Sequence, residues 1–250
     1  MKRTLTFARR NTLEVLRDPI SLFFGICFPI ILLLLLTIIN NAIPAEANME
    51  VYHIENLAPG IASFGLCFLA LFASMLVSKD RCSSFMQRLL TSPLTAWEFI
   101  AGYCLPLIPI GLAQVAVCYL ASIILGLPVT VHLIGAILGT LPTIVLYSSL
   151  GLLLGTVLSE KAVGGICGAL LTNLAGWLSG TWFSIEMIGG VFETICEILP
   201  FYSASLSARA LLNGDFGEAL PSLLCVTAWA AIAFVAAVIV FMGNMKKDNR

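Results

Sequence analysis

The sequence predicts an all-α integral membrane protein with six spanning helices, and three observations support that fold class. Of the 250 residues, 59% are hydrophobic and only 11% are charged, with a mean hydropathy of +1.00. Soluble domains carry about 25% charged residues, so this chain has too few to cover a surface in water. Six apolar runs reach the roughly 20 residues that cross a bilayer. Lysine and arginine, finally, gather in alternate links between those runs.

The same composition argues against several classes of partner and site. A net charge of −1 and a pI near 6.1 argue against binding to nucleic acid. The eight cysteines form no CxxC pair, and most lie inside apolar runs, where cysteine behaves as a small hydrophobe. We therefore expect neither a disulfide framework nor a metal site.

We interpret residues 1–250 as a single transmembrane domain. The expected spans are residues 20–40, 57–78, 99–125, 133–158, 162–183 and 220–242. Pro29, Pro106, Pro109 and Pro142 lie inside these runs, and membrane helices tolerate internal proline better than soluble helices do.

Residues 1–18, before the first span, have an amphipathic pattern. At 100° per residue, one face gathers Leu5, Ala8, Thr12, Val15 and Leu16, and the opposite face gathers Arg10, Glu14 and Arg17. This pattern predicts an interfacial helix that lies in the headgroup plane on the cytoplasmic side. A basic leader that only fixes the topology is the alternative.

The distribution of positive charge predicts the orientation. Twelve of the thirteen lysines and arginines fall in links on one side, and Arg209 is the exception. Because positive residues stay inside, we expect both termini and the link at 79–98 to be cytoplasmic, and residues 41–56 and 184–217 to lie outside. The expected location is a cell membrane, most simply the bacterial cytoplasmic membrane.

Residues 184–217 are expected to form two short outer helices rather than another span. Three carboxylates (Glu186, Glu193 and Glu197) would be costly in lipid. Pro200 should separate the two helices, and Asn213-Gly214 should end the second. Whether they are re-entrant or lie on the surface stays open at this point.

The cytoplasmic link at 79–98 carries a second amphipathic helix. Cys82, Phe85, Met86 and Leu89 share its apolar face. Such a face fits either a groove on a soluble partner or the membrane surface.

Several motifs resemble those of type-2 ATP-binding-cassette (ABC) export permeases. One is Lys79-Asp80-Arg81 followed by the run Gln87 to Thr95, then Glu98 and Gly102. Others are Leu57-Ala58-Pro59-Gly60, Leu199-Pro200 and Arg209-Ala210-Leu211-Leu212-Asn213-Gly214. Cys82-Ser83-Ser84 departs from the family's pattern, which has a charged residue and then Gly-Thr there.

The resemblance implies a transmembrane half that pairs with a second copy or a sister permease and is driven by two cytosolic ABC ATPase subunits. The link would contain the coupling helix, whose ATPase-docking residues would be Arg81, Phe85, Met86, Arg88, Leu89 and Leu90. The sequence has no GxxxxGK[ST] phosphate loop, so we expect this chain to be no enzyme and to bind no cofactor. ATP and Mg would bind to the partner ATPase.

The fifth expected span carries small residues at steps of four: Gly164, Gly168, Thr172, Gly176 and Gly180. Small-xxx-small ridges let helix backbones approach closely. The ridge therefore indicates either packing within one subunit or a dimer seam, which the resemblance places at spans one and five.

Two sets of residues are candidates for a substrate path: the row Phe64, Phe68 and Phe72, and the pair Asn173 and Trp177. No Asp, Glu, Lys or Arg lies in the middle of a span, which argues against an ion-coupled carrier. We expect a permease that exports an amphipathic or apolar substrate, such as a drug, an antibiotic peptide or a lipid-like molecule. A stand-alone membrane immunity or assembly module without an ATPase is the alternative.

Overall fold

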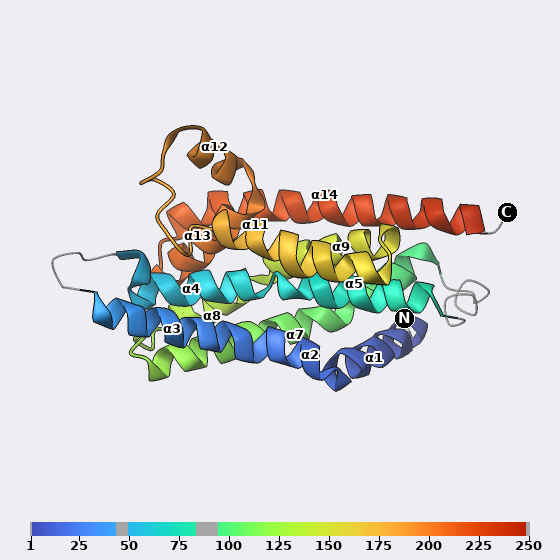
Figure 1. The fold of residues 1–250 in the computed structure, drawn as a ribbon, viewed down its shortest axis with the longest axis horizontal. Coiled ribbons are helices and arrows are strands. Elements are labelled where there is room, and N and C mark those ends of the chain that lie inside the picture. Colours follow the sequence, from blue (N-terminus) through green and yellow to red (C-terminus); the bar gives the residue numbers. More distant parts are fainter. Residues whose placement is uncertain (1, 44–49, 84–94, 249–250) are drawn as a thin grey trace.

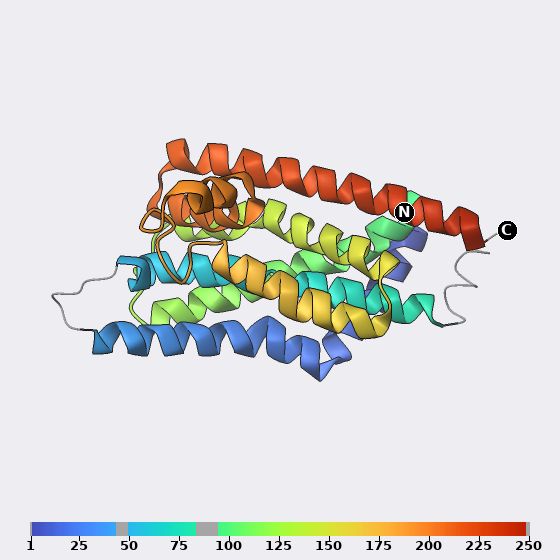
Figure 2. The ribbon, with the colours of Figure 1, turned by 45° about the horizontal axis from the view of Figure 1, so that its top comes forward.

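The computed structural model describes residues 2–43, 50–83 and 95–248, and the apolar runs of the sequence are helical there. The long helices lie side by side along one axis (Figures 1 and 2). The first half contains α1 (Lys2–Arg17), α2 (Pro19–Leu22), the π-helix η1 (Phe23–Cys27), α3 (Phe28–Ala42), the 3-10 turn η3 (Glu50–Tyr52), α4 (Ile54–Gly65), α5 (Phe68–Arg81) and α7 (Ala96–Ile124). The second half contains α8 (His132–Gly139), α9 (Leu141–Val157), α10 (Glu160–Gly165), the π-helix η4 (Ile166–Leu171), α11 (Thr172–Trp177), α12 (Gly190–Ile198), α13 (Pro200–Asn213) and α14 (Phe216–Asp248).

Within the described residues, five helical stretches are long and apolar enough to cross a membrane: Phe23–Ala42, Ile54–Arg81, Trp97–Ile124, His132–Val157 and Phe216–Gly243. The number rises to six if α12 and α13, which meet at a bend of 77°, count as one broken span. The all-α membrane fold expected from the sequence is therefore confirmed.

The fifth expected span differs from its prediction. Its helix covers residues 160–177 in three short segments and stops at Trp177 instead of continuing to 183. It is not among the five stretches above, because Glu160, Lys161 and Asn173 make it less apolar. Beyond Trp177 the chain turns, and Gly180 takes φ +64°, which is outside the helical region. The segment nevertheless runs alongside α5 and α4 (Figure 1).

The second span, α4 and α5, forms the centre of the bundle. Of its most apolar window, 94% is buried inside the protein, against 22% for both the first and the sixth span. It contacts α3, α7, α9, α13 and η4. The second span is therefore the core around which the others pack.

Close helix packing in this core depends on two glycines of α9. A Cβ atom at Gly151 would collide with the carbonyl oxygen of Ala70, and one at Gly155 would lie 2.7 Å from the carbonyl oxygen of Ser74. Both contacts are to the backbone of α5. Lipid tails are as apolar as leucine, so close approach of this kind is what holds membrane helices together.

The two ends of the bundle differ in what they hold. The start of α1, the end of α5, the start of α7 and the last turns of α14 lie at one end, which we call the proximal end (Figure 1). The end of α3, the turn η3 and the helix α12 lie at the other, the distal end (Figures 1 and 2).

The two helices expected between residues 184 and 217 are both present at the distal end. Leu199 separates them, and Gly214 ends α13 in the left-handed conformation at φ +80°. Most of α13 is buried, and it contacts α4, α8 and α14. By contrast α12 exposes Val191, Ile195 and Ile198. The pair therefore divides into one helix packed within the bundle and one on its surface.

Candidate functional site at the proximal end

A buried carboxylate, Asp80, joins three helices at the proximal end. Its two oxygens accept hydrogen bonds from Arg10 on α1, Nη1 to Oδ2 at 2.6 Å and Nη2 to Oδ1 at 2.8 Å. The hydroxyl of Tyr103 on α7 donates to Oδ2 at 2.7 Å. The side chain of Asp80 is only 3% exposed. Paired, bidentate geometry of this kind is what makes a buried charge tolerable.

Neighbouring acidic groups stabilise the positive charge of Arg10. Burial by itself lowers the pKa of Arg10, but the hydrogen bond and negative charge of Asp80, followed by the charge of Glu14, raise that pKa above its ordinary value. Glu14 lies 2.5 Å from Arg10 and 3.1 Å from Lys79. The pair with Lys79 is solvent-exposed and contributes little.

Arg81, the neighbour of Asp80, binds a fourth helix. Its Nη1 donates to the carbonyl oxygens of Gly155 at 3.0 Å and Leu158 at 3.4 Å. These carbonyls belong to the end of α9, where helical acceptors lack partners within the helix. Arg81 therefore caps α9 from the last residue of α5.

The far side of the same link is fixed by a capping box. Glu98 Oε2 accepts from the amide of Thr95 at 3.0 Å, and the Thr95 hydroxyl accepts from the amide of Glu98 at 3.3 Å. Asp80 and Arg81 at the start of the link, and Thr95 and Glu98 at its end, thus connect it to α1, α7 and α9. We call these four residues, with Arg10 and Tyr103, the proximal network.

The helix α1 is present as expected, but the face that it buries in the protein differs from the apolar face read from the sequence. The two faces overlap in part: Ala8 and Val15, which belong to the predicted face, are buried. Phe7 and Asn11 are buried although they lie off that face, whereas Leu5 and Leu16 are 64% and 47% exposed. The reason is the contact of α1 with α7. Phe7 meets Phe99 and Tyr103, and Phe99 in turn stacks on Phe241 with ring centroids 4.1 Å apart.

Asn11 supplies the hydrogen-bond donor that a proline removes from α7. Pro106 has no amide hydrogen, so it cannot donate to the carbonyl of Gly102, four residues earlier. Asn11 Nδ2 donates to that carbonyl instead, at 3.0 Å, and the Asn11 side chain is fully buried. A polar residue on α1 is therefore matched to a proline on α7.

Replacing Asn11 with leucine should lower the unfolding free energy by about 1–3 kcal/mol, because the carbonyl of Gly102 loses its donor. Thermal unfolding of the purified protein in detergent measures this. The control is Pro106→Ala, which restores an amide to α7. Asn11→Leu should lower the unfolding free energy less in the Pro106→Ala background than in the wild-type chain. An equal loss of unfolding free energy in both backgrounds would show that Asn11 does not act through the carbonyl of Gly102.

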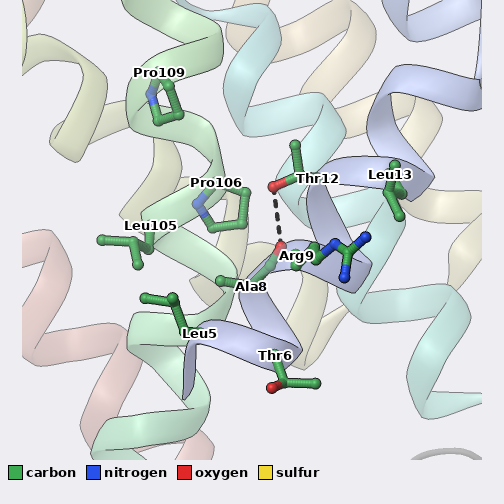
Figure 3. Close-up of a pocket in the computed structure, with 9 residues that line it drawn as sticks. All are labelled: Leu5, Thr6, Ala8, Arg9, Thr12, Leu13, Leu105, Pro106 and Pro109. Atoms are coloured by element: carbon green, nitrogen blue, oxygen red, sulfur yellow. Dashed lines mark hydrogen bonds between the residues drawn. The ribbon is translucent and has the colours of Figure 1, made fainter. Parts of the chain in front are cut away.

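A mainly apolar groove of about 680 Å³ lies beside this contact, between α1 and α7 (Figure 3). Its α7 wall consists of Leu105, Pro106 and Pro109, and its α1 wall includes Leu5 and Leu13. The hydroxyl of Thr12 is turned back to the carbonyl of Ala8 at 3.0 Å (Figure 3). The groove therefore offers mostly hydrocarbon.

The glycine ridge expected on the fifth span does not form one continuous face. Gly164 has open space around it, whereas a Cβ at Gly176 would lie 2.8 Å from Trp182 Nε1, and Gly180 lies beyond the helix against Ile185 and Tyr202. Gly168 faces Leu71 loosely, and Thr172 lies 3.9 Å from the sulfur of Cys67. The π-helix η4 breaks the four-residue period, so part of the ridge packs inside the subunit.

The two candidate path sets lie in different surroundings. Phe64, Phe68 and Phe72 are at most 5% exposed. Phe68 contacts Phe24 and Phe28 of the first span, and Phe64 contacts Trp182. In contrast Asn173 and Trp177 are exposed on the outer face of α11, Trp177 by 59%. The structure does not bring the two sets together.

Of the predicted docking residues, Arg81 is placed as above, and Phe85, Met86, Arg88, Leu89 and Leu90 lie outside the described residues. Sequence reasoning missed Arg10, Asp80 and Tyr103. The available signal was one acid between two bases, Lys79-Asp80-Arg81, at the end of an apolar span.

The fold and this site define a multi-pass helical membrane protein in which the proximal network connects α1, α5, α7 and α9. A sequence model of the ABC-2 type transporter family matches residues 2–212, and the chain belongs to that family. It is therefore a permease component of an ABC transporter. No curated protein matches the chain.

Proposed function

We propose that this permease is the transmembrane subunit of an exporter, and that separate cytosolic ABC ATPases drive it through the link at 79–98. ATP and Mg would be bound and used on those subunits, two per transporter. The substrate would be amphipathic or apolar. A permease needs a place where movement of the ATPase reaches several helices at once, and the proximal link is suited to that role.

The proximal network is the observation that carries this proposal. Asp80 and Arg81 on one side, and Thr95 with Glu98 on the other, connect the link to α1, α7 and α9. A displacement of the link would therefore be passed to three helices rather than absorbed by one. Coupling needs such a contiguous set of packed or hydrogen-bonded elements.

Truncating the predicted apolar anchors of the link tests the proposal. Phe85→Ala with Leu89→Ala should dissociate or uncouple the ATPase, because removing such an anchor usually costs more than about 1 kcal/mol. Co-purification and substrate-stimulated ATP hydrolysis measure the two effects. Gln87→Ala, in the same segment but off the apolar face, is the matched control. An intact complex with unchanged stimulated hydrolysis would count against docking through these anchors, whereas failure of the wild-type chain to co-purify with any ATPase would favour the stand-alone membrane module.

We further propose that the proximal end faces the cytoplasm, since it carries most of the lysines and arginines. The exposed leucines of α1, Leu5, Leu13 and Leu16, would then rest in the headgroup region of the inner leaflet. The permease would be a multi-pass protein of the bacterial cytoplasmic membrane with both termini inside.

Cysteine labelling of intact cells checks this orientation. On a background without the eight native cysteines, Glu50→Cys at the distal end should react with an impermeant maleimide in intact cells. Ser83→Cys at the proximal end should react only after permeabilisation. The opposite pattern would invert the topology.

The proposal also includes a second permease, a copy or a sister chain, facing the outer side of the fifth span. Gly164, Asn173 and Trp177 are exposed there, and a small residue beside polar and aromatic ones suits contact with protein more than with lipid. Substrate would then move between the subunits along Asn173 and Trp177. A path along Phe64, Phe68 and Phe72 would require the first span to part from α4 and α5.

A further inference from the structure

The distal end contains a pocket of about 760 Å³ that is distinct from the proximal network. Its walls come from η3, the start of α4, the turn at 180–187, α13 and the start of α14. Four aromatic residues line it: Tyr52, Trp182, Phe183 and Tyr202. The hydroxyl of Tyr52 donates to the carbonyl of Trp182 at 3.1 Å, which ties two of these walls together. A volume of this size is in the range of small-molecule sites.

Arg209 is the only cation among the described residues that line the pocket. Its Nη2 donates to the carbonyl of Gly180 at 2.8 Å and its Nε to the carbonyl of Asn56 at 3.2 Å. Within the part of the chain that the structure describes, its other donors have no acceptor and no carboxylate lies within ion-pair distance. A partly buried guanidinium that meets only neutral carbonyls lacks the counter-charge that burial normally requires.

The counter-charges at this pocket lie on its exposed residues. Glu50, Glu186 and Glu218 line the pocket and are solvent-exposed, and in the described ranges none forms a salt bridge. A purely anionic ligand would be attracted by Arg209 and repelled by three carboxylates. A purely cationic ligand would meet the opposite conflict. Only a ligand carrying both charges is matched to the whole lining.

We propose that this pocket binds a zwitterionic phosphate ester, with its phosphate at Arg209 and its ammonium group at the glutamates and aromatic rings. Arginine pairs phosphate in a planar, forked geometry. Aromatic faces attract quaternary ammonium groups through their negative quadrupole. The same chemistry occurs in a phospholipid headgroup and in a free phosphocholine-type solute. The inference concerns binding by this chain, and holds whether or not the proposed ATPase coupling is correct.

The experiment titrates the full-length chain in maltoside detergent with three probes: dihexanoyl phosphatidylcholine, phosphocholine and the anionic dihexanoyl phosphatidylglycerol. Tryptophan fluorescence reports occupancy of the pocket. The variant Trp182→Phe keeps an aromatic ring at this position but lacks the indole fluorophore, so it shows which part of the signal arises in the pocket. The wild-type chain should bind the phosphatidylcholine about tenfold more tightly than the phosphatidylglycerol. Phosphocholine that competes at similar concentrations would identify the free headgroup as sufficient, and failure to compete would assign the site to a lipid.

Two sets of variants make the charge assignment decisive. Arg209→Lys should weaken binding of the phosphatidylcholine about tenfold. Glu186→Gln with Glu218→Gln, both exposed and therefore safe for folding, should reverse the preference in favour of the anionic phosphatidylglycerol. Glu193→Gln with Glu197→Gln makes the same charge change on α12, outside the pocket lining, and should leave the preference as it is. Absence of binding, equal affinity of the two lipids, or an unchanged preference in the Glu186 and Glu218 variant would overturn the proposal.

Discussion

Arg10→Gln is expected to lower the unfolding free energy by about 3 kcal/mol and to weaken the response of ATP hydrolysis to substrate. Arg10 and Tyr103 both donate hydrogen bonds to the buried carboxylate of Asp80, and after this change Tyr103 remains as a donor. An uncompensated buried charge is costly, and the link at 79–98 would lose its buried ion pair with α1. Chemical unfolding in detergent measures the first effect, and hydrolysis by the assembled transporter measures the second.

The reverse change gives an asymmetric control. Asp80→Asn should lower the unfolding free energy less than Arg10→Gln does. The reason is that Arg10 still pairs with Glu14 at 2.5 Å and its side chain is 35% exposed, so that water reaches it. The double variant should be more stable than Arg10→Gln alone, since it removes both charges together. If Asp80→Asn is the more damaging single change, or the double variant shows no recovery, the buried carboxylate is not the centre of the network.

Gly151→Val is expected to cost about 3 kcal/mol and to abolish accumulation of folded protein in the membrane. The added Cβ would collide with the carbonyl oxygen of Ala70, and that backbone cannot move unless α5 and α9 separate. Since α5 belongs to the most buried span, the separation would open the centre of the bundle. Yield in the membrane and thermal unfolding in detergent provide the measurements.

Gly135→Val is the matched control for this substitution. Gly135 also lies within a membrane-crossing helical stretch, and a Cβ there would meet no atom within 4 Å. Both changes replace glycine with valine, which has a slightly higher helix propensity, so the difference between the two variants isolates the collision at the α5–α9 contact. Comparable losses of stability for the two variants would mean that close packing against α5 is not what makes Gly151 necessary.

Length, composition and local patterns were enough to predict the fold class and most of the elements. Apolar runs of about 20 residues can satisfy their backbone in a bilayer only as helices, so length and composition were enough to locate five of the six expected spans. Pro200 and Asn213-Gly214 predicted the limits of α13 because they act locally, on the backbone of their own residues. The resemblance to type-2 ABC permeases likewise depends on sequence order alone, and the match over residues 2–212 confirmed the family.

Which residues meet was decided only by the tertiary structure. Arg10 and Asp80 lie 70 positions apart, and Asn11 and Gly102 lie 91 positions apart, so no local pattern links them. The glycines of the fifth span looked like one ridge, yet the π-helix η4 turned Gly164 outward and Gly176 inward. Periodicity fixes only the direction in which a side chain leaves its own helix. Partners depend on how helices are placed around one another, and in a membrane that placement follows from close fit rather than from hydrophobicity.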